Sequence, residues 1–512
     1  MAGSRRGFGG LAIYAGALLA MVGSPAGASP AAASPTPEAR AAARFDAVVH
    51  DRAALRLFLR GMPKGGDLHN HLWGAPYAED FLAWAGADGQ CVTTGAQPAI
   101  ADGPCDGKDK VAARDLGRRD PALYNRAINA LSVRNYTPDP AAAASGHDQF
   151  FSTFERFAAS AVRNGGAMLA VTREYAAGDG VLYVESSTNP NALRAFAVDH
   201  QKDWTGDLEA SFKALQPGLA AMVEASRREM DADEREADRL QGCGGAARPA
   251  AGPCAVVLGY QPFVERAQPA GFAFAQMAAA FALAEADPRF VGVNIVNPED
   301  DPTSLADYSL HMRMFRFLSA RHPKVKLALH AGELTLGLVP PRDLTFHIRE
   351  AVETAGARRI GHGVDIAYED GAQALLARMA RDRVAVEINL TSNDVILGVK
   401  GAEHPLALYR KAGVPVVLST DDEGVSRIDM TNEYLRAATE QGLGYRDLKA
   451  LARDSLEYAF LPGDSLWTSV GRARVAACVK PGASCDAFLA RSPKAAAQQR
   501  LETAFEAFER GF

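Results

Sequence analysis

Short apolar, β-branched runs recur along the chain and alternate with segments of helical periodicity. Eight such runs stand out, at residues 65–72, 180–187, 254–263, 290–297, 325–333, 359–366, 384–392 and 414–422. Between them, stretches such as 343–356 and 370–383 place apolar residues at helical spacing. Near-continuous apolar strands that alternate with helices are typical of a parallel sheet buried on both faces. Eight of them predict an α/β fold with a closed (β/α)8 TIM barrel rather than an open doubly wound sheet.

A long segment separates the first predicted strand from the second. Residues 73–179 include the aromatic, helically periodic stretch DQFFSTFERFAASAV at 148–162. Excursions of this length are usually functional lids or caps. We therefore expect a long helical insertion that covers the mouth of the barrel, with extra helices at both ends of the chain. The last of these is the amphipathic segment LETAFEAFERGF at 501–512.

The first 28 residues have the pattern of a targeting signal. A basic start is followed by an apolar stretch at 11–22 and by small residues at Ala26 and Ala28. This pattern is typical of a secretory signal peptide with an A-x-A cleavage site. The Arg5-Arg6 pair also fits a twin-arginine signal, so twin-arginine and general secretory export both stay open.

Cysteine usage agrees with export. The six cysteines all follow the signal and form three close couples, each around a Gly-, Pro- or Ala-rich segment. In an oxidising compartment this spacing predicts local disulfides, although other pairings stay open. The expected pairs are Cys91–Cys105, Cys243–Cys254 and Cys478–Cys485. We therefore expect a periplasmic or secreted protein. Its expected parts are a signal peptide at 1–28, a linker and N-terminal helix at 29–59, and a barrel domain at 60–512.

Composition narrows the range of partners. The 512 residues are 48% hydrophobic and 23% charged, with a formal net charge of −6. This is an ordinary globular composition, and its mildly acidic balance gives no reason to expect nucleic acid or an anionic membrane as a partner. Beyond the signal, no stretch is apolar and long enough to cross a bilayer. A small-molecule substrate is therefore the expected partner, and the oligomeric state stays open.

Residues that bind metals or transfer protons occur where the predicted strands end. They are His69 and His71, His330 with Glu333, His362, and the pair Asp421 and Asp422. In a parallel barrel the carboxyl ends of all strands converge on one face, where the active site is built. We therefore expect these side chains, although distant in sequence, to meet at the barrel mouth.

The spacing of these residues favours a metal site. His69 and His71 are two positions apart on a strand, so both point to the same side. Adding His330 and Asp421 gives three imidazoles and one carboxylate, a ligand set that suits one zinc ion with a water still attached. Glu333 lies three residues beyond His330, close enough to serve that water as a proton shuttle. A single histidine at a strand end is usually structural, but several in this order indicate a metal centre.

The motifs DLHNHL, LHAGE, RIGHGVD and STDD, in this order, resemble the adenosine deaminase family of zinc-dependent (β/α)8-barrel hydrolases in the metallo-dependent hydrolase superfamily. The resemblance runs from about residue 60 to about residue 460. It implies that one zinc ion is held by His69, His71, His330 and Asp421. It further implies that Glu333 donates a proton to N1 of a purine while hydroxide attacks C6, and that His362 orients the hydroxide. Asp422 would contact the purine near N7.

Three departures from the family pattern concern the substrate. The family usually has Asp-Gly after H-x-H-L, where this chain has Trp73-Gly74. Trp73 is compatible with stacking on a base or ribose and equally with filling space. On the fourth strand a Gly of the family is replaced by Asn297, which fits a hydrogen bond to a purine edge or a turn before Pro298. A Glu-x-Arg pattern on the second strand is replaced by Glu-Ser-Ser, starting at Glu185.

The resemblance implies an aminohydrolase that converts adenosine, and deoxyadenosine as well, to the inosine product and ammonia. The same chemistry on adenine or a modified aminopurine is an alternative, and a catalytically silent secreted binding protein is another. Cytidine-type zinc deaminases carry H-x-E with P-C-x-x-C, which is absent here. A second metal is not expected, because the fourth predicted strand has no lysine to bridge two ions.

Overall fold

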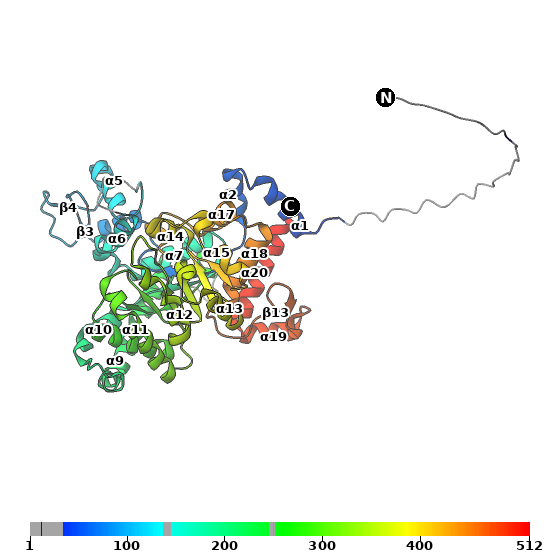
Figure 1. Ribbon diagram of the computed structural model, residues 1–512. Helices are drawn as coiled ribbons and strands as arrows, with labels where there is room; N and C mark the ends of the chain where they lie inside the picture. The colour runs from blue at the N-terminus through cyan, green and yellow to red at the C-terminus, as the bar shows by residue number, and fades with distance from the viewer. Residues whose placement is uncertain (1–11, 13–33, 137–144, 245–248, 250) are drawn as a thin grey trace, which may run out of the picture. The chain divides into compact units, whose positions relative to one another are not determined.

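The computed structural model describes residue 12 and residues 34–136, 145–244, 249 and 251–512 (Figure 1). Pro37–Phe512 form one compact unit. The predicted signal peptide at 1–28 therefore lies, residue 12 apart, outside the described residues.

All eight predicted barrel strands are present, each shorter than the apolar run that predicted it. They are β1 (Gly65–His71), β5 (Val181–Ser187), β6 (Val257–Gln261), β8 (Asn294–Val296), β9 (Ala328–Ala331), β10 (Arg359–His362), β11 (Ala385–Ile388) and β12 (Val416–Leu418). The runs were too long because several continue past the strand into the turn that carries the polar residues. The run at 384–392, for example, includes the start of helix α14 (Leu390–Leu397).

The strands close into a parallel barrel. β1, β5 and β6 pair in parallel, as do β9 to β12 in sequence, while β8 pairs with the short β7 (Phe263–Glu265). Parallel bridges join the remaining neighbours, at Tyr260 with Phe290 and at Val293 with Leu327. A last bridge between Asn70 and Asp421 joins the first strand to the last. The predicted (β/α)8 barrel is confirmed, and its closing bridge includes a predicted metal ligand.

Helices follow the strands around the outside of the barrel. They include α7 (Gly165–Gly178), α8 (Asn191–His200), α9 (Leu208–Gln241), α10 (Ala270–Ala286), α11 (Pro302–Arg321), α13 (Ala372–Asp382), α15 (Leu406–Lys411), α17 (Met430–Glu440) and α18 (Tyr445–Glu457). Helix α10 is alanine-rich and almost wholly buried, and it packs against α8, α9 and α11. The predicted helix at 370–383 is confirmed as α13. The segment at 343–356 instead divides into a 3-10 turn, the short helix α12 (His347–Glu350) and a π turn.

The insertion between β1 and β5 is largely helical, as predicted, and it also holds a small sheet that the sequence did not predict. It contains α3 (Ala78–Ala87), α4 (Leu116–Arg119), α5 (Pro121–Ala130) and α6 (Gly146–Ala161), and also an antiparallel sheet of β2 (Cys91–Thr93), β3 (Ile100–Ala101) and β4 (Lys110–Ala112). The Cys91–Cys105 disulfide closes a loop too short and too rich in Gly and Pro for a helix, so its backbone groups pair across strands instead.

Helix α6 lies over the mouth of the barrel, as the length of the insertion predicts. It packs against α14 and the short α16 (Glu423–Ser426), which follow β11 and β12. Figure 1 shows α5, α6, β3 and β4 gathered on one side of the barrel. The insertion therefore stands at the end of the barrel where the strand-end residues lie.

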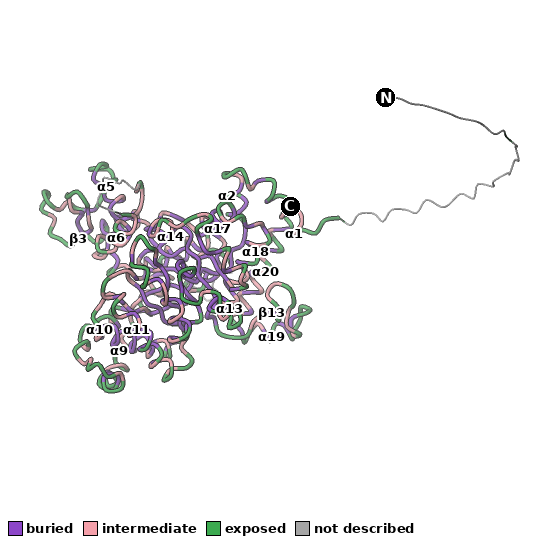
Figure 2. Tube along the Cα trace, in the orientation of Figure 1, coloured by how far each residue is buried: buried purple, intermediate pink, exposed green. Residues whose placement is uncertain are grey.

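The extra helices at the two ends of the chain pack on each other. Helices α1 (Pro37–Val48), α2 (Arg52–Gly61) and α20 (Pro493–Arg510) meet α17 or α18 on the barrel wall. Edge-to-face contacts between Phe58 and Phe508, with ring centroids 5.2 Å apart, join α2 to α20. Figure 2 shows the buried residues concentrated in the barrel and the exposed ones around it. The predicted closing helix is thus confirmed and is longer than expected.

All three expected disulfides are present. They join Cys91 to Cys105, Cys243 to Cys254 and Cys478 to Cys485. The last pair belongs to a small apolar cluster of its own around α19 (Ala483–Arg491), apart from the main core. Among the helices of the described part of the chain, none is long and apolar enough to cross a membrane.

Removing the first disulfide with Cys91→Ala and Cys105→Ala should loosen the insertion. Loops of about 15 residues are expected to contribute about 3 kcal/mol when closed by a disulfide. We expect faster cleavage near the β2–β4 sheet in limited proteolysis, followed by mass spectrometry of the fragments. The matched variant Cys478→Ala/Cys485→Ala should leave cleavage of the insertion unchanged. Equal cleavage in both variants would contradict the structural role of the first disulfide.

Candidate metal centre and active site

The four predicted metal ligands converge at the barrel mouth. One ligand atom from each of His69, His71, His330 and Asp421 lies within 4.8 Å of all the others. The Nε2 atoms of His69 and His330 are 3.0 Å apart, and those of His69 and His71 are 3.3 Å apart. Asp421 Oδ1 lies 3.3 Å from His71 Nε2. Side chains from β1, β9 and the end of β12 thus form one group that can hold a metal ion.

The closing seam of the barrel fixes this arrangement. The Asp421 N–H donates to the carbonyl of His69 at 2.8 Å, and the His71 N–H donates to the carbonyl of Asp421 at 3.1 Å. Asp421 itself adopts a left-handed backbone conformation with φ of 58°. These bonds hold the carboxylate against both histidines of β1, so the ligand set depends on barrel closure.

The outward-facing nitrogens of two histidines are bound by side chains that sequence reasoning missed. Glu387 on β11 lies 2.7 Å from His69 Nδ1, and Asn294 Oδ1 on β8 lies 2.9 Å from His330 Nδ1. Both partners accept a hydrogen bond, so each Nδ1 carries the proton and each Nε2 presents a lone pair to the centre. The available signal was a polar residue inside a buried strand, in VEI and VNIV.

Glu387 belongs to a buried chain of charges. Arg359, at the start of β10, donates to Glu387 and also to Glu185 of β5, and all three side chains are at most 1% exposed. Burial would raise the pKa of Glu387, but the charge of Arg359 and the bond from His69 hold it below its usual value. Glu185, the first residue of the divergent Glu-Ser-Ser pattern, therefore pairs with Arg359 inside the barrel.

Glu333 and His362 lie beside the ligand group. Together with Asp421 they form a second set whose ligand atoms lie within 4.8 Å of one another. Glu333 Oε1 is 3.4 Å from His362 Nδ1. Burial, together with the charges of Asp421 and Glu299, raises the pKa of Glu333 well above its usual value. A protonated carboxyl group at this position can donate a proton.

A relay of side chains sets the tautomer of His362. The Leu406 N–H donates to His404 Nδ1 at 3.2 Å, so His404 Nε2 carries the proton and donates to Asn393 Oδ1 at 3.0 Å. The Asn393 amide then donates to His362 Nδ1 at 2.9 Å. Burial lowers the pKa of His362 to about 3 and that of His404 to about 4, so both rings are neutral at pH 7. His362 therefore presents an Nε2–H donor, which has no partner within the described chain.

Asp422 faces the loop that follows β1. Burial and the neighbouring charge of Asp421 raise the pKa of Asp422 well above its usual value. Its Oδ1 has no hydrogen-bond partner among the described residues. A Cβ at Gly74 would stand 1.7 Å from that oxygen, so only glycine fits at this point. The Gly that follows Trp73 thus makes room for Asp422.

Trp73 and Asn297, the two predicted substrate contacts that depart from the family pattern, have different surroundings. Trp73 is half-buried and packs against the main core. Asn297 follows β8 with φ of 79°, and its Oδ1 is buried with no partner in the described part of the chain. A strained residue with an orphaned polar atom is typical of a ligand-contacting position. Asn297 thus has an unpaired polar atom at a strained position, and Trp73 has a packing role.

Unpaired polar atoms gather around the predicted site. In the described residues, buried side-chain atoms without a hydrogen-bond partner include Asn297 Oδ1, Glu333 Oε1, His362 Nε2, Asn389 Oδ1 and Asp422 Oδ1. Each of them lies at the carboxyl end of a barrel strand or shortly after it. Because buried polar groups are normally satisfied, this set indicates a polar ligand with several donors and acceptors.

The cap is tied to the same region. His147 Nε2, near the start of α6, lies 3.0 Å from Asp300 Oδ1 in the loop after β8. No motif surrounds His147 in the sequence. The contact links the insertion to the loop that also carries Asn297.

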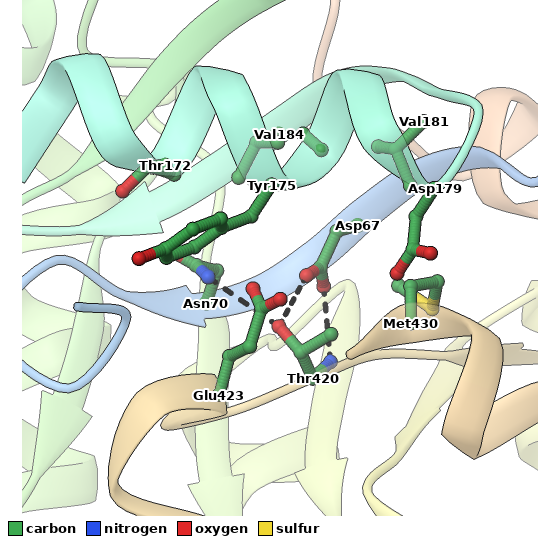
Figure 3. A pocket seen from close by; sticks show the side chains of 11 residues that line it. Asp67, Asn70, Thr172, Tyr175, Asp179, Val181, Val184, Thr420, Glu423 and Met430 are labelled. Atoms are coloured by element: carbon green, nitrogen blue, oxygen red, sulfur yellow. Dashed lines mark hydrogen bonds between the residues drawn. The ribbon is translucent and has the colours of Figure 1, made fainter. Parts of the chain in front are cut away.

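A small acidic cavity lies behind the closing seam, between β1, β5 and α7 (Figure 3). The Thr420 hydroxyl and the Thr420 backbone N–H both donate hydrogen bonds to the Asp67 carboxylate. The Glu423 side chain points toward this pair. Burial raises the pKa of Asp67 to about 7 and that of Glu423 well above its usual value. None of the metal-ligand candidates lines this cavity, so it is separate from the ligand group. Its Asp67–Thr420 hydrogen bonds hold the residue that precedes Asp421.

Comparison with known proteins shows which family the second half of the barrel resembles. Residues 244–467 match the family model described as adenosine deaminase. The adenosine deaminase of Yersinia pseudotuberculosis is 36% identical over 146 residues, which are 28% of this chain and 40% of that protein. The segment at 244–467 thus resembles the adenosine deaminase family. His330, Glu333, His362 and Asp421 lie inside the segment that matches the family model, whereas His69 and His71 precede it. The chain spans about two fifths of the length of the curated relatives it matches.

Solved structures show how far the barrel fold extends over this chain. An amidohydrolase from Burkholderia ambifaria with bound Zn has a TM-score of 0.53 at 18% identity, covering 89% of this chain and 95% of that one. An Arabidopsis N6-mAMP deaminase has a TM-score of 0.51 at 16% identity, covering 88% and 99%. At these identities the likeness concerns the barrel fold, which thus includes β1 with His69 and His71.

Replacing Arg359 by Met should strongly destabilise the barrel. The change leaves the carboxylates of Glu185 and Glu387 buried without their cation, which typically costs about 3–5 kcal/mol. Denaturant unfolding should show a clear fall in the midpoint. Arg239→Met, which removes a surface pair with Glu236 on α9, should leave the midpoint unchanged. Similar midpoints for the two variants would show that the buried pair is not needed for stability.

Proposed function

We propose that this chain is an exported, zinc-dependent purine nucleoside deaminase that hydrolyses adenosine, and deoxyadenosine as well, at C6. The observation that carries the proposal is the convergence of three imidazoles and one carboxylate on one point, with a protonated glutamic acid and a neutral histidine beside it. This arrangement supplies a metal site, an acid and a hydrogen-bond donor within one barrel mouth.

The residues present fit a single zinc ion. His69 Nε2 and His330 Nε2 face each other at 3.0 Å, and their Nδ1 protons are already engaged by Glu387 and Asn294. Two lone pairs that face each other in a buried site repel unless a cation or a proton lies between them. Three nitrogens and one carboxylate oxygen match the ligand preference of zinc and leave a position for water. We therefore assign the ligands as His69, His71, His330 and Asp421.

Zinc held there would supply hydroxide at neutral pH by lowering the pKa of a coordinated water to about 7. The chain's own residues complete the reaction. Burial raises the pKa of Glu333, so its carboxyl group is suited to donate a proton to N1 of the purine as the electrons of the C6–N1 double bond move onto N1. His362 offers its Nε2–H to the oxygen that attacks C6, which orients that oxygen and stabilises its charge.

The remaining groups hold the substrate. Asp422 has a raised pKa, so its carboxyl group can donate a hydrogen bond to N7 of the purine. Asn297 offers an unpaired amide oxygen to the purine edge. The loss of the amino group as ammonia requires a second proton. The C6 hydroxyl group releases this proton as it becomes the carbonyl oxygen, and the Glu333 carboxylate, having given its own proton to N1, can carry it to the leaving nitrogen. Together these contacts favour a 6-aminopurine over a pyrimidine.

A second candidate is the same chemistry on another aminopurine, such as adenine or a modified nucleoside. It is favoured by Trp73, which stands where the family usually has an aspartate that helps to hold the ribose, and which packs against the core. If no other residue replaces that aspartate, ribose adds little affinity. The catalytically silent binding protein is disfavoured, since the full set of ligands together with Glu333 and His362 is retained.

Export rests on two observations. Three disulfides are present in the described residues, and such bonds persist in oxidising compartments. The segment at 1–28 has the pattern of a signal peptide. We therefore propose that residues 1–28 are removed and that the barrel domain at 60–512 functions in the periplasm or outside the cell.

The proposed activity can be tested with the purified mature chain. Ultraviolet absorbance should show deamination of adenosine and deoxyadenosine, with weaker or no turnover of adenine and AMP. A chelator should abolish turnover, and zinc should restore it, because the proposed hydroxide depends on the ion. Turnover of adenine alone would select the second candidate. No turnover of any substrate by protein with one bound zinc would overturn the deaminase proposal.

Glu333→Gln should separate acid catalysis from metal binding. The amide keeps the shape of the side chain but cannot donate the proton, so kcat should fall about 100- to 10,000-fold. Zinc content by elemental analysis should stay at one ion per chain, since Glu333 is not among the four ligands. Asp343→Asn, an acidic residue outside the site on the 3-10 turn at Pro341–Leu344, should keep full activity. Loss of zinc from the Glu333→Gln protein would assign Glu333 to the metal instead.

A further inference from the structure

The turn that follows β9 carries Glu333 on an exceptional backbone. Gly332 has φ of 75°, and a Cβ there would meet Asp365 and Ile348 at 2.4 and 2.7 Å. This conformation turns two consecutive N–H groups to the same side. Neither N–H bonds to a neighbouring strand, so both need an acceptor from elsewhere in the fold.

Glu299 supplies both acceptors. The Gly332 N–H donates to its Oε1 at 3.1 Å, and the Glu333 N–H donates to its Oε2 at 2.8 Å. Glu299 is 2% exposed and lies after β8, two residues beyond Asn297. The two oxygens of the Glu299 carboxylate therefore bind the backbone at Gly332 and at Glu333, the proposed acid.

Glu299 is itself held on its other side. His347 Nδ1, from α12, lies 2.6 Å from Glu299 Oε1, and its ring stacks on Tyr308 with centroids 3.7 Å apart. Arg266 Nη1 lies 3.6 Å from the same oxygen. The opposite end of this guanidinium donates to the carbonyl of His330 at 2.6 Å. A single buried ion pair thus contacts the turn at both of its ends.

We propose that Glu299 is a positioning residue for Glu333, which aims the acid at the substrate through the two backbone N–H groups, with Arg266 and His347 as its anchors. This inference rests on the proposed function, because it assigns Glu299 a part in the proton transfer by Glu333. Glu299 touches neither the proposed ligand atoms nor the substrate position.

The geometry explains why a carboxylate is needed here. An amide has one acceptor oxygen, and its NH2 group would face a backbone N–H, donor against donor. Glu299→Gln keeps the volume and can satisfy only one of the two N–H groups. The turn then loses one of its fixed points, and a displacement of the acid by a fraction of an ångström is costly for proton transfer.

The decisive experiment compares Glu299→Gln with Glu509→Gln in the mature zinc-loaded protein. Glu509 is a matched control, since it is also a buried carboxylate bonded to a tyrosine and a lysine, on α20. For Glu299→Gln we expect kcat for adenosine to fall about 10- to 100-fold with KM, zinc content and inosine affinity by calorimetry unchanged. Hydrogen exchange at the amides of Gly332 and Glu333 should accelerate. The control should leave kcat and these two amides unchanged.

The outcomes are distinguishable. Unchanged kcat and unchanged exchange in Glu299→Gln would overturn the proposal, and so would a fall in kcat of the same size in the control. If the wild-type protein deaminates nothing, the proposed function fails, while exchange at the two amides still decides whether Glu299 holds the turn. If Glu299→Gln does not fold, His347→Asn decides, because it removes an anchor of Glu299 and should give the same effects at smaller size.

Discussion

The structure depends on a cation buried in the barrel between two carboxylates. Arg359 is fully buried, donates to Glu185 and Glu387, and lies with its guanidinium 3.7 Å from the centroid of the Phe460 ring. A buried arginine without such partners would be prohibitively costly, so strands β5, β10 and β11 must keep their relative positions. Glu387 carries the constraint onward to His69. The same charge pattern that limits the barrel's geometry therefore also orients a ligand of the proposed metal site.

The residues around the site act mainly by fixing where protons are. Glu387 and Asn294 place protons on the outer nitrogens of two histidines, and the chain from His404 through Asn393 leaves a proton on the inner nitrogen of His362. The Nε2 atoms of three neighbouring imidazoles thus differ: those of His69 and His330 present lone pairs to the site, and that of His362 presents an N–H donor. The difference is set entirely by which hydrogen-bond partner lies behind each ring.

The sequence predicts the barrel and its strand-end residues because both follow from local patterns. Apolar runs mark the strands, and a polar residue that interrupts such a run at its end, as at His330 or Asp421, marks the mouth. It does not predict Glu387, Asn294 or Glu299, because their partners depend on the stagger between strands that are far apart in the chain. The β2–β4 sheet was missed for a related reason: its strands are two or three residues long, too short for any periodicity, and a disulfide holds them.

Backbone strain concentrates where the ligand is expected. Asn297, His362 and Asp421 all have φ between 58° and 79°, a region that non-glycine residues seldom adopt. For Asp421 the closing hydrogen bonds with β1 hold the conformation, and for His362 the Asn393 contact does. Asn297 has no such compensation from its side chain, whose oxygen is buried and unpaired.

Asparagine tolerates this conformation better than most residues, but glycine, which the family has there, tolerates it without cost. A side chain kept at a position that favours glycine, with its polar atom unsatisfied, is best explained by a contact that forms when substrate binds. If the proposed function holds, the departure at Asn297 changes how the purine is bound, while the proposed acid and metal ligands match those that the family resemblance implies.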